Sequence, residues 1–249
     1  MSLSKQPNRA VSIIIPAFNE ERLIGETLAR VKEAMGAFGA SGWQTELIVC
    51  DNNSTDHTAE LARAAGAKVV FEEINQIGRA RNAGAAAATG QWLVFIDADS
   101  RPSRELFAEA AEQMVSGRCL AGGCTVRLDG KHRPANAVTR LWNGISRAGT
   151  FLAGSFIFCE AAAFHEAGGF SPDLFAGEEI DLSRRLKRLA RQRGKRMVIL
   201  HRHPLVTSAR KVHLYTLREH LRFLLKTVMR PRKVLTSREA CHTWYDGRR

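Results

Sequence analysis

Two aspartates follow the longest buried-strand pattern of the chain. Trp92–Ile96 is a run of five apolar residues, and Asp97 and Asp99 come directly after it. Such a short run is typical of a strand buried on both faces of a parallel sheet. Residues two apart in extended backbone point to the same side, so the two carboxylates would lie together. Paired carboxylates suit Mg²⁺ or Mn²⁺, which take water and substrate phosphates as further ligands. Acids that are merely solvated, or that cap the next helix, are the alternative.

Two earlier strands also end in acids or amides. Val11–Ile15 is a predicted strand followed by Pro16-Ala17-Phe18-Asn19-Glu20, in which Asn19 has the residue type of a helix N-cap. The next predicted strand, Thr45–Cys50, ends at Asp51. Strands that alternate with helices form parallel sheets joined by crossovers, and ligands bind at the carboxyl ends of such strands. Three polar strand ends on one edge therefore predict a nucleotide site in an α/β fold.

The remaining pattern extends this α/β interpretation to about residue 205. Small residues dominate the predicted helix Gly78–Ala88, so this helix can lie close to the sheet. Gly122-Gly123 indicates a bulge in the predicted strand Cys119–Leu128. The other predicted helices are Glu21–Phe38, Thr58–Ala65, Ser103–Val115, Arg133–Gly149, Ala161–Ala167, Glu178 to about Arg193, and His213–Met229; the other predicted strands are Lys68–Phe71, Gly154–Cys159 and Arg196–Leu200.

Length and composition bound the domain count and the compartment. The 249 residues are 45% hydrophobic, which suffices for one large α/β domain, or for one domain with an appendage. No stretch has the length and apolarity of a membrane span, and the polar N-terminus does not have a signal-peptide pattern. Five scattered cysteines without a zinc spacing indicate buried thiols in a reducing compartment. We therefore expect a cytoplasmic protein.

Positive charge is concentrated in the C-terminal third. The net charge is +12, and residues 182–249 hold 20 Lys/Arg against 3 Asp/Glu. A basic region of this kind predicts an anionic partner or a solvated helix face. The candidate partners are a phosphorylated substrate, an anionic membrane surface and nucleic acid.

Six segments, taken in order, resemble glycosyltransferase family 2, which has the nucleotide-sugar-binding GT-A fold. They are Pro16–Glu20, Asp51 with Ser54-Thr55-Asp56, Gly78–Gly84, Asp97-Ala98-Asp99, Gly168-Gly169-Phe170, and Glu178–Leu182 with Arg185. The resemblance covers about residues 11–205 and implies a Rossmann-like, mostly parallel sheet flanked by helices. It implies a donor-nucleotide site made of Pro16, Ala17, Asn19, Glu20, Asp51, Arg81 and Asp97. It also implies a Mg²⁺ or Mn²⁺ site made of Asp97, Asp99 and, as in some relatives, His203.

The resemblance also implies the chemistry of the acceptor side. The family's catalytic base falls at the position of Glu179, where its members usually have aspartate, and Asp181 is a second catalytic candidate in the same segment. A carboxylate at this position would take the proton of an acceptor hydroxyl in a single displacement that inverts the anomeric centre. Apart from the resemblance, acids at the start of a helix are explained by the helix dipole.

We therefore expect a metal-dependent glycosyltransferase. Its partners would be a nucleotide-diphosphate sugar as donor and a saccharide or glycolipid as acceptor, and we expect no nucleic acid. The expected parts are a disordered leader over residues 1–10, a GT-A domain over residues 11–205, and a basic helical extension over residues 206–249. Within the domain, residues 11–101 would form the nucleotide-sugar half and residues 102–205 the acceptor half.

Other functions stay open at this point. A polyprenyl-phosphate acceptor is already ionised and would need no base. The basic stretch Arg184–Arg196 and the amphipathic helix His213–Met229 would suit a peripheral contact with the inner face of the cell membrane, although such a helix can also cover a soluble core. A nucleotidyltransferase would share the sheet, but no glycine-rich phosphate loop follows the first strand. A non-catalytic membrane- or nucleic-acid-binding protein would leave the acids at three strand ends unexplained.

Overall fold

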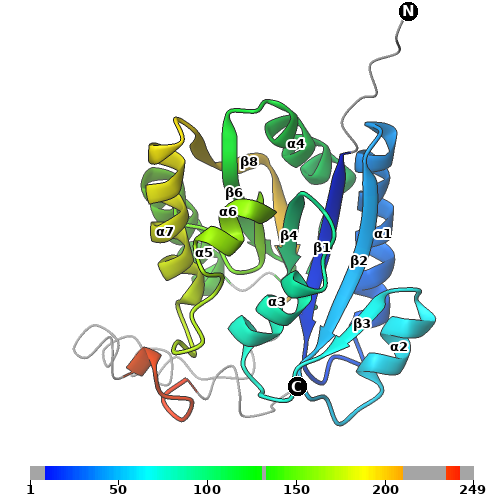
Figure 1. Ribbon diagram of the computed structural model, residues 1–249. Helices are drawn as coiled ribbons and strands as arrows, with labels where there is room; N and C mark the ends of the chain where they lie inside the picture. The colour runs from blue at the N-terminus through cyan, green and yellow to red at the C-terminus, as the bar shows by residue number, and fades with distance from the viewer. Residues whose placement is uncertain (1–8, 131–132, 210–233, 242–249) are drawn as a thin grey trace, which may run out of the picture.

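The computed structural model describes residues 9–130, 133–209 and 234–241, and it shows one mixed sheet with helices on both faces (Figure 1). The strands are β1 (Ala10–Ala17), β2 (Gln44–Asp51), β3 (Lys68–Phe71), β4 (Trp92–Ile96), β5 (Ser100–Arg101), β6 (Cys119–Leu128), β7 (Phe156–Glu160) and β8 (Arg196–Thr207). The helices are α1 (Ile24–Ala40), α2 (Thr58–Ala64), α3 (Ile77–Ala86), α4 (Arg104–Val115), α5 (Arg133–Gly149), α6 (Ala161–Glu166) and α7 (Glu178–Gln192). The predicted α/β fold class is confirmed.

The sheet consists of a parallel half and a mixed half. Its strand order is β3-β2-β1-β4-β7-β6-β8-β5, and β3, β2, β1 and β4 pair in parallel. β7 pairs antiparallel with both β4 and β6, and β5 pairs antiparallel with β8. The parallel half therefore places the carboxyl ends of β1, β2 and β4 at one edge of the sheet, as the alternation of strands and helices predicts.

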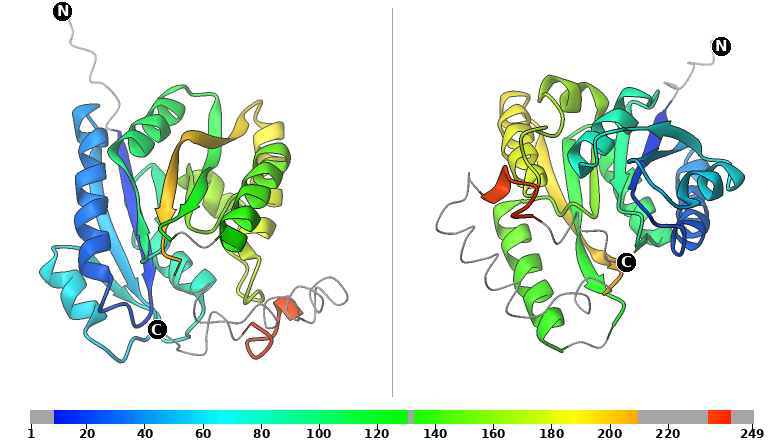
Figure 2. Two further views of the ribbon diagram at one scale, coloured as in Figure 1. Left: turned by 180° about the vertical axis from the view of Figure 1, so that it is seen from behind. Right: turned by 90° about the horizontal axis from the view of Figure 1, so that it is seen from below.

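Strand β1 sends alternate side chains into two separate cores. Ile13 and Ile15 belong to the core that includes residues of α1 and α4, whereas Ile14 belongs to the core that includes residues of α3, α6 and α7. The two groups of helices cover opposite faces of the sheet (Figure 2). A strand covered on both faces must be apolar at every position, which explains why it is a continuous apolar run in the sequence.

Helix α3 packs closely against β1, and this close packing requires a small residue at the point of contact. A Cβ atom added to Gly84 would lie 2.4 Å from Cγ2 of Ile14. Gly90, just before β4, is equally constrained, because an added Cβ would lie 2.6 Å from the backbone nitrogen of Ser12. The small residues around position 84 therefore have the packing role that the sequence predicts.

The start of helix α1 differs from the prediction. The helix begins at Ile24, its N-cap residue is Leu23, and Asn19 lies well outside it. Asn19 has a φ of 52°, and its Oδ1 accepts a hydrogen bond from the backbone N–H of Thr55 at 2.8 Å. The prediction of Asn19 as the helix cap is therefore wrong, because its amide joins two strand-end loops instead.

Part of the predicted chain lies outside the described residues. Residues 1–8 of the predicted leader, the helix His213–Met229 and most of the extension over residues 206–249 belong to this part, whereas Ala10, the last residue of the predicted leader, is the first residue of β1. Residues 234–241 are described and contact the loop before α7, where the backbone N–H of Phe175 donates to the carbonyl of Leu235 at 2.7 Å. Within the described ranges, no helix has the length and apolarity needed to cross a bilayer.

Candidate functional site

The carboxyl ends of β1 and β2 lie next to each other and are joined by hydrogen bonds. Ala17 pairs with Asp51 in the strand register. The backbone N–H of Asn19 donates to Oγ of Ser54 at 3.0 Å, and the backbone N–H of Ser54 donates to the Asp51 carboxylate at 3.1 Å. Among the residues predicted to bind the nucleoside, the structure brings together in this place Pro16, Ala17, Asn19, Glu20 and Asp51.

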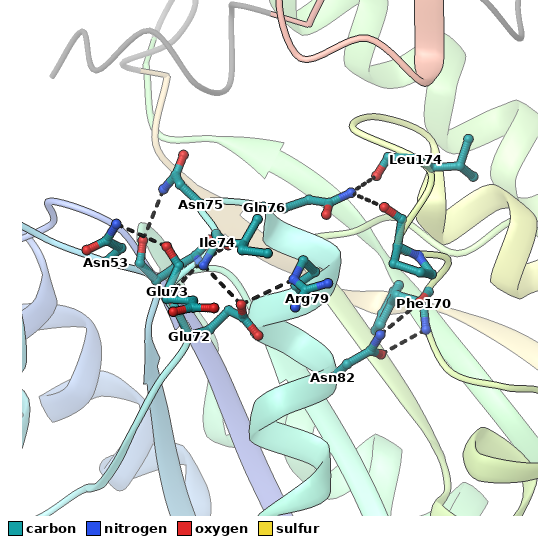
Figure 3. Close-up of polar contacts among 12 residues, drawn as sticks. Asn53, Glu72, Glu73, Ile74, Asn75, Gln76, Arg79, Asn82, Phe170 and Leu174 are labelled. Atoms are coloured by element: carbon teal, nitrogen blue, oxygen red, sulfur yellow. Dashed lines mark hydrogen bonds and ion pairs between the residues drawn. The ribbon is translucent and has the colours of Figure 1, made fainter.

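The loop after β3 ties this edge to the segment that precedes α7 (Figure 3). Gln76 is buried, and its amide donates to the backbone carbonyls of Pro172 and Leu174, both at 2.8 Å. Asn82 of α3 donates to the carbonyl of Phe170 at 2.8 Å and accepts from the N–H of the same residue at 2.9 Å. These hydrogen bonds fix the loop before α7 against the parallel half of the sheet.

The two aspartates after β4 lie in a tight turn. The backbone N–H of Ser100 donates to the carbonyl of Asp97 at 3.1 Å, which closes the turn. Oδ1 of Asp97 accepts from Nη2 of Arg81 at 2.9 Å, whereas Oδ1 of Asp99 lies 3.5 Å from Oγ1 of Thr207 at the end of β8. The prediction of extended backbone at this point is therefore wrong, and the two carboxylates have different neighbours.

Arg81 is a buried cation that joins two parts of the site. Its side chain is 2% exposed, and its guanidinium donates to Glu178 at 2.7 Å, to Asp97 at 2.9 Å and to the carbonyl of Gly154 at 3.0 Å. Burial alone would lower the pKa of Arg81, but the carboxylates of Asp97 and Glu178 raise it above its ordinary value. Arg81 also lines the cavity described below, its guanidinium connects the turn after β4 to the start of α7, and its predicted contact with the donor diphosphate stays a prediction.

Glu178 and Glu179 begin α7 and have different surroundings. Gly177, whose φ is 75°, precedes them as the N-cap residue. Glu178 is paired with Arg81, whereas Glu179 is partly exposed; both glutamates line a cavity of about 190 Å³ that Asp97 and Arg81 also line. Burial raises the pKa of Glu179 to about 8; the Glu178 carboxylate contributes to the rise and Arg81 opposes it. Glu179 can therefore exchange a proton near neutral pH, as a general base requires.

Asp181, the other predicted catalytic residue, is held in an ion pair. Its Oδ2 accepts from Nε of Arg185 at 2.9 Å, and the guanidinium of Arg185 also donates to the carbonyls of Ala167 and Gly169. Asp181 is not among the described residues that line the cavity. The structure therefore gives Asp181 a role in fixing the glycine loop that follows α6.

The structure does not bring His203 to the aspartates. Strand β8, which the sequence predicts to end at Leu200, continues to Thr207, so His203 lies inside the strand and is exposed. Thr207 is the β8 residue beside Asp99. His203 lies between Leu200 and Leu205, where β8 bulges out of its pairing with β6, and among the described residues it joins no cluster of metal-binding side chains. The predicted end of β8 is wrong, because pairing with β6 and β5 extends the strand beyond its apolar run.

Asp97 and Asp99 fit a divalent cation that takes few ligands from the protein. Both side chains are partly exposed at the carboxyl edge, and carboxylate oxygens are the ligands that Mg²⁺ and Mn²⁺ prefer. In the part of the chain that the structure describes, no group of three His, Cys, Asp or Glu side chains is placed to hold a metal. A cation here would therefore need substrate phosphates as further ligands, as Mg²⁺ sites commonly do.

Three residues that line the cavity were not predicted from the sequence. Gly154, Ser155 and Phe175 line the cavity from the loops before β7 and α7. The carbonyl of Ser155 accepts from the backbone N–H of Asp97 at 3.4 Å, and a Cβ atom added to Gly154 would lie 3.1 Å from a guanidinium nitrogen of Arg81. These residues act through their backbone, so their side-chain types do not reveal them.

The topology and the polar strand ends define a GT-A fold, the fold class of nucleotide-sugar transferases. The chain belongs to glycosyltransferase family 2, whose sequence model matches residues 12–166. This confirms the resemblance seen in the motifs. Glu178 and Glu179 lie beyond the matched residues.

Curated relatives match this chain over part of their length. Glucosyl-3-phosphoglycerate synthase of Mycolicibacterium smegmatis is 38% identical over 99 residues, which are 36% of this chain and 31% of that protein. An uncharacterized glycosyltransferase of Mycobacterium bovis is 31% identical over 143 residues, or 57% of each chain. The matched part therefore spans from about a third to just over half of these relatives.

Solved structures share the fold over almost the whole chain. Mannosyltransferase PcManGT from Pyrobaculum calidifontis, in complex with GDP-Man and Mn²⁺, has a TM-score of 0.65 at 21% identity, with 95% of this chain and 69% of that chain covered. Glucosyl-3-phosphoglycerate synthase from Mycobacterium tuberculosis, in complex with Mn²⁺, UDP-Glc and phosphoglyceric acid, has a TM-score of 0.61 at 20% identity, covering 94% of this chain and 80% of that chain.

Proposed function

We propose that this protein is a metal-dependent glycosyltransferase that moves a sugar from a nucleotide-diphosphate sugar to a saccharide or lipid-linked acceptor, with Glu179 as the general base. The observation that carries the proposal is the cavity lined by both Glu179 and Asp97. It lies at the carboxyl edge of the parallel strands, where α/β sheets bind their ligands. It also places a carboxyl group of raised pKa close to the aspartate turn.

The donor would lie along the edge from β2 to the turn after β4. Asn19, Glu20 and Asp51 would bind the nucleoside, since their polar groups converge at adjacent strand ends. Asp99, together with the Asp97 oxygen that does not contact Arg81, would hold Mg²⁺ or Mn²⁺. The bound cation would offset negative charge on the diphosphate. The Mn²⁺ complexes of two proteins with this fold support the choice of metal.

The acceptor would enter the cavity beside Glu179. Its hydroxyl would give its proton to the Glu179 carboxylate while its oxygen forms a bond to the anomeric carbon. The bond from that carbon to the diphosphate oxygen would break in the same step, and the nucleotide diphosphate would leave with the bonding electrons. A single displacement of this kind inverts the anomeric centre. A positioned base commonly contributes about 10²–10⁴-fold to the rate of such a proton transfer.

The donor site is tested by thermal unfolding with UDP, GDP, UDP-Glc and GDP-Man, each with and without Mn²⁺. A ligand that binds the native state raises the melting temperature by mass action. We expect one nucleotide to raise it only with Mn²⁺ present, and the rise to disappear in Asp99→Asn. Glu60→Gln, which changes an exposed acid of α2, is the matched control and should keep the rise. A rise that needs no Mn²⁺, or that survives in Asp99→Asn, would contradict the site.

A lipid phosphate acceptor is the second candidate, and the exposed aliphatic face of α5 described below favours it. Undecaprenyl-phosphate 4-deoxy-4-formamido-L-arabinose transferase of Klebsiella pneumoniae is 32% identical over 132 residues, which are 50% of this chain and 39% of that protein. A phosphate acceptor is already ionised, so turnover would survive in Glu179→Gln. A hydroxyl acceptor requires the base, so the same variant would lose turnover while still binding the donor.

A further inference from the structure

Helix α5 turns three uncharged polar side chains toward the protein. The amide of Asn143 donates to the carbonyl of Val126 at 2.9 Å and accepts from the N–H of the same residue at 3.0 Å. Ser146 is buried, and its hydroxyl donates to the carbonyl of Phe151 at 2.6 Å. Asn136 donates to the carbonyl of Gly130 at 3.2 Å. The inner face of this helix is therefore hydrogen-bonded to backbone, whereas the inner face of an ordinary surface helix is apolar.

The outer face of α5 is aliphatic. Val138 is 67% exposed, Leu141 is 66% exposed and Ile145 is 46% exposed. Their spacings of three and four residues place them in one stripe along the helix. Among the described residues only four other large hydrophobic side chains are exposed, and they come from α2, the region around β3 and α4. The inverted polarity of α5 is therefore a local feature, and it leaves an apolar stripe facing solvent.

The exposed face of α5 also carries cations and no acids. Arg140 and Arg147 are both exposed, and their spacing of seven residues places them in a row of their own, separated from the aliphatic stripe by the small exposed residues Ala137, Gly144 and Ala148. The chain has no Asp or Glu between Asp129 and Glu160. An anionic surface could therefore approach α5 without repulsion from its own helix.

A second row of cations on α7 adjoins the C-terminal end of α5. Arg184, Lys187, Arg188 and Arg191 are three or four residues apart and line one groove of α7. Nζ of Lys187 donates to the carbonyl of Gly149, the last residue of α5, at 2.6 Å. The basic row therefore adjoins the C-terminal end of α5.

We propose that Val138, Leu141 and Ile145, with Arg140, Arg147 and the basic row of α7, form a surface that docks on an anionic lipid bilayer. Aliphatic side chains enter the boundary between headgroups and acyl chains, while arginines beside them bind lipid phosphates. Nucleic acid fits this surface less well, because exposed Val, Leu and Ile contribute neither stacking nor base-edge hydrogen bonds. The basic C-terminal third supplies only part of the charge; the apolar contact comes from α5.

The docking surface is connected to the cavity by a short segment. The chain leaves α5 at Gly149 and reaches Gly154 and Ser155, which line the cavity, within six residues. Docking through α5 would therefore place the acceptor side of the cavity near the headgroups, where a lipid-linked acceptor is presented. The docking itself involves neither Glu179 nor the aspartate turn, so a test of docking is independent of a test of the proposed function.

The test is flotation of the full-length protein with vesicles of phosphatidylcholine alone and of phosphatidylcholine with one third phosphatidylglycerol. We expect binding to the anionic vesicles, reduced roughly a hundredfold in V138S/L141S/I145S because three aliphatic side chains no longer insert. R140Q/R147Q should reduce binding roughly fivefold for each arginine removed. The controls L61S/V115S and R63Q/R118Q change exposed residues of the same kinds elsewhere and should bind as the parent does.

Three results would overturn the proposal. Equal binding to neutral and anionic vesicles would remove the role of the arginines. Unchanged binding of V138S/L141S/I145S would place the contact elsewhere in the chain. In V138S/L141S/I145S, the melting temperature or the oligomeric state could change while vesicle binding stays the same. That result would show that another segment or a second copy covers α5. Vesicle binding needs no donor or turnover, so a failed base assignment would leave this test unaffected.

Discussion

Replacing Glu179 by glutamine should change the pH dependence of stability as well as activity. The pKa of this carboxyl rises from its ordinary value of 4.5 to about 8, because partial burial and the neighbouring Glu178 carboxylate disfavour its charged form. Between these two values the native state keeps a proton that the unfolded chain has released. The stability of the wild-type protein therefore falls as pH rises through this window, whereas glutamine has no proton to lose.

The size of this change in stability follows from the pH range between the two pKa values of Glu179. One group that is fully protonated in the native state and fully ionised in the unfolded state changes stability by about 1.4 kcal/mol per pH unit. Glu179 is partly exposed, so solvent screening should narrow the pH window between the two pKa values to roughly half of its width. From pH 5 to pH 8, Glu179→Gln should therefore gain on the order of 2 kcal/mol relative to the wild type. Turnover with a hydroxyl acceptor should fall about 10²–10⁴-fold, with donor binding retained.

The assay is urea unfolding of both proteins at pH 5, 6, 7 and 8, with the difference in unfolding free energy plotted against pH. Other titrating groups contribute equally to both proteins and cancel in this difference. Ser183→Ala, one turn further along α7, is the control: it removes a buried hydroxyl that donates to the carbonyl of Glu179 at 2.7 Å, so its cost should not vary with pH. A flat difference for Glu179→Gln would refute the raised pKa. For the wild type, kcat/KM should rise with pH up to about 8, as Glu179 becomes the ionised base.

Two further predictions concern packing around the site. Arg81→Leu should cost about 3–5 kcal/mol of unfolding free energy, because it leaves Asp97 and Glu178 without their buried partner. Arg81→Lys keeps the positive charge and should cost less. Urea unfolding measures both losses, and equal losses would contradict the bridging role of the guanidinium. Gly84→Ala should cost about 1–3 kcal/mol, because its Cβ would meet Ile14 at 2.4 Å. In the control, Gly25→Ala in α1, the new Cβ meets nothing within 4 Å, so a matching loss there would refute the packing argument.

The sequence by itself determined the fold class and the edge that carries the site. Continuous apolar runs such as Trp92–Ile96 indicate strands that are buried on both faces, and the polar residues after them mark the carboxyl ends. Both signals are local, because burial on two faces and the end of a strand are expressed in adjacent residues. The six segments taken together were sufficient to identify the family, which the match over residues 12–166 confirms.

Only the tertiary structure decided which charged groups pair with one another. Arg81 and Glu178 are 97 residues apart, so nothing local indicates that they form a buried pair at 2.7 Å. Arg81 is held between Glu178 and Asp97, while burial and the Glu178 carboxylate raise the pKa of Glu179. The position of His203 was likewise decided by strand pairing, which extends β8 beyond its apolar run. The pKa of a carboxyl, the neighbours of a guanidinium and the exposed face of α5 depend on contacts between segments distant in sequence, and such contacts exist only once the chain has folded.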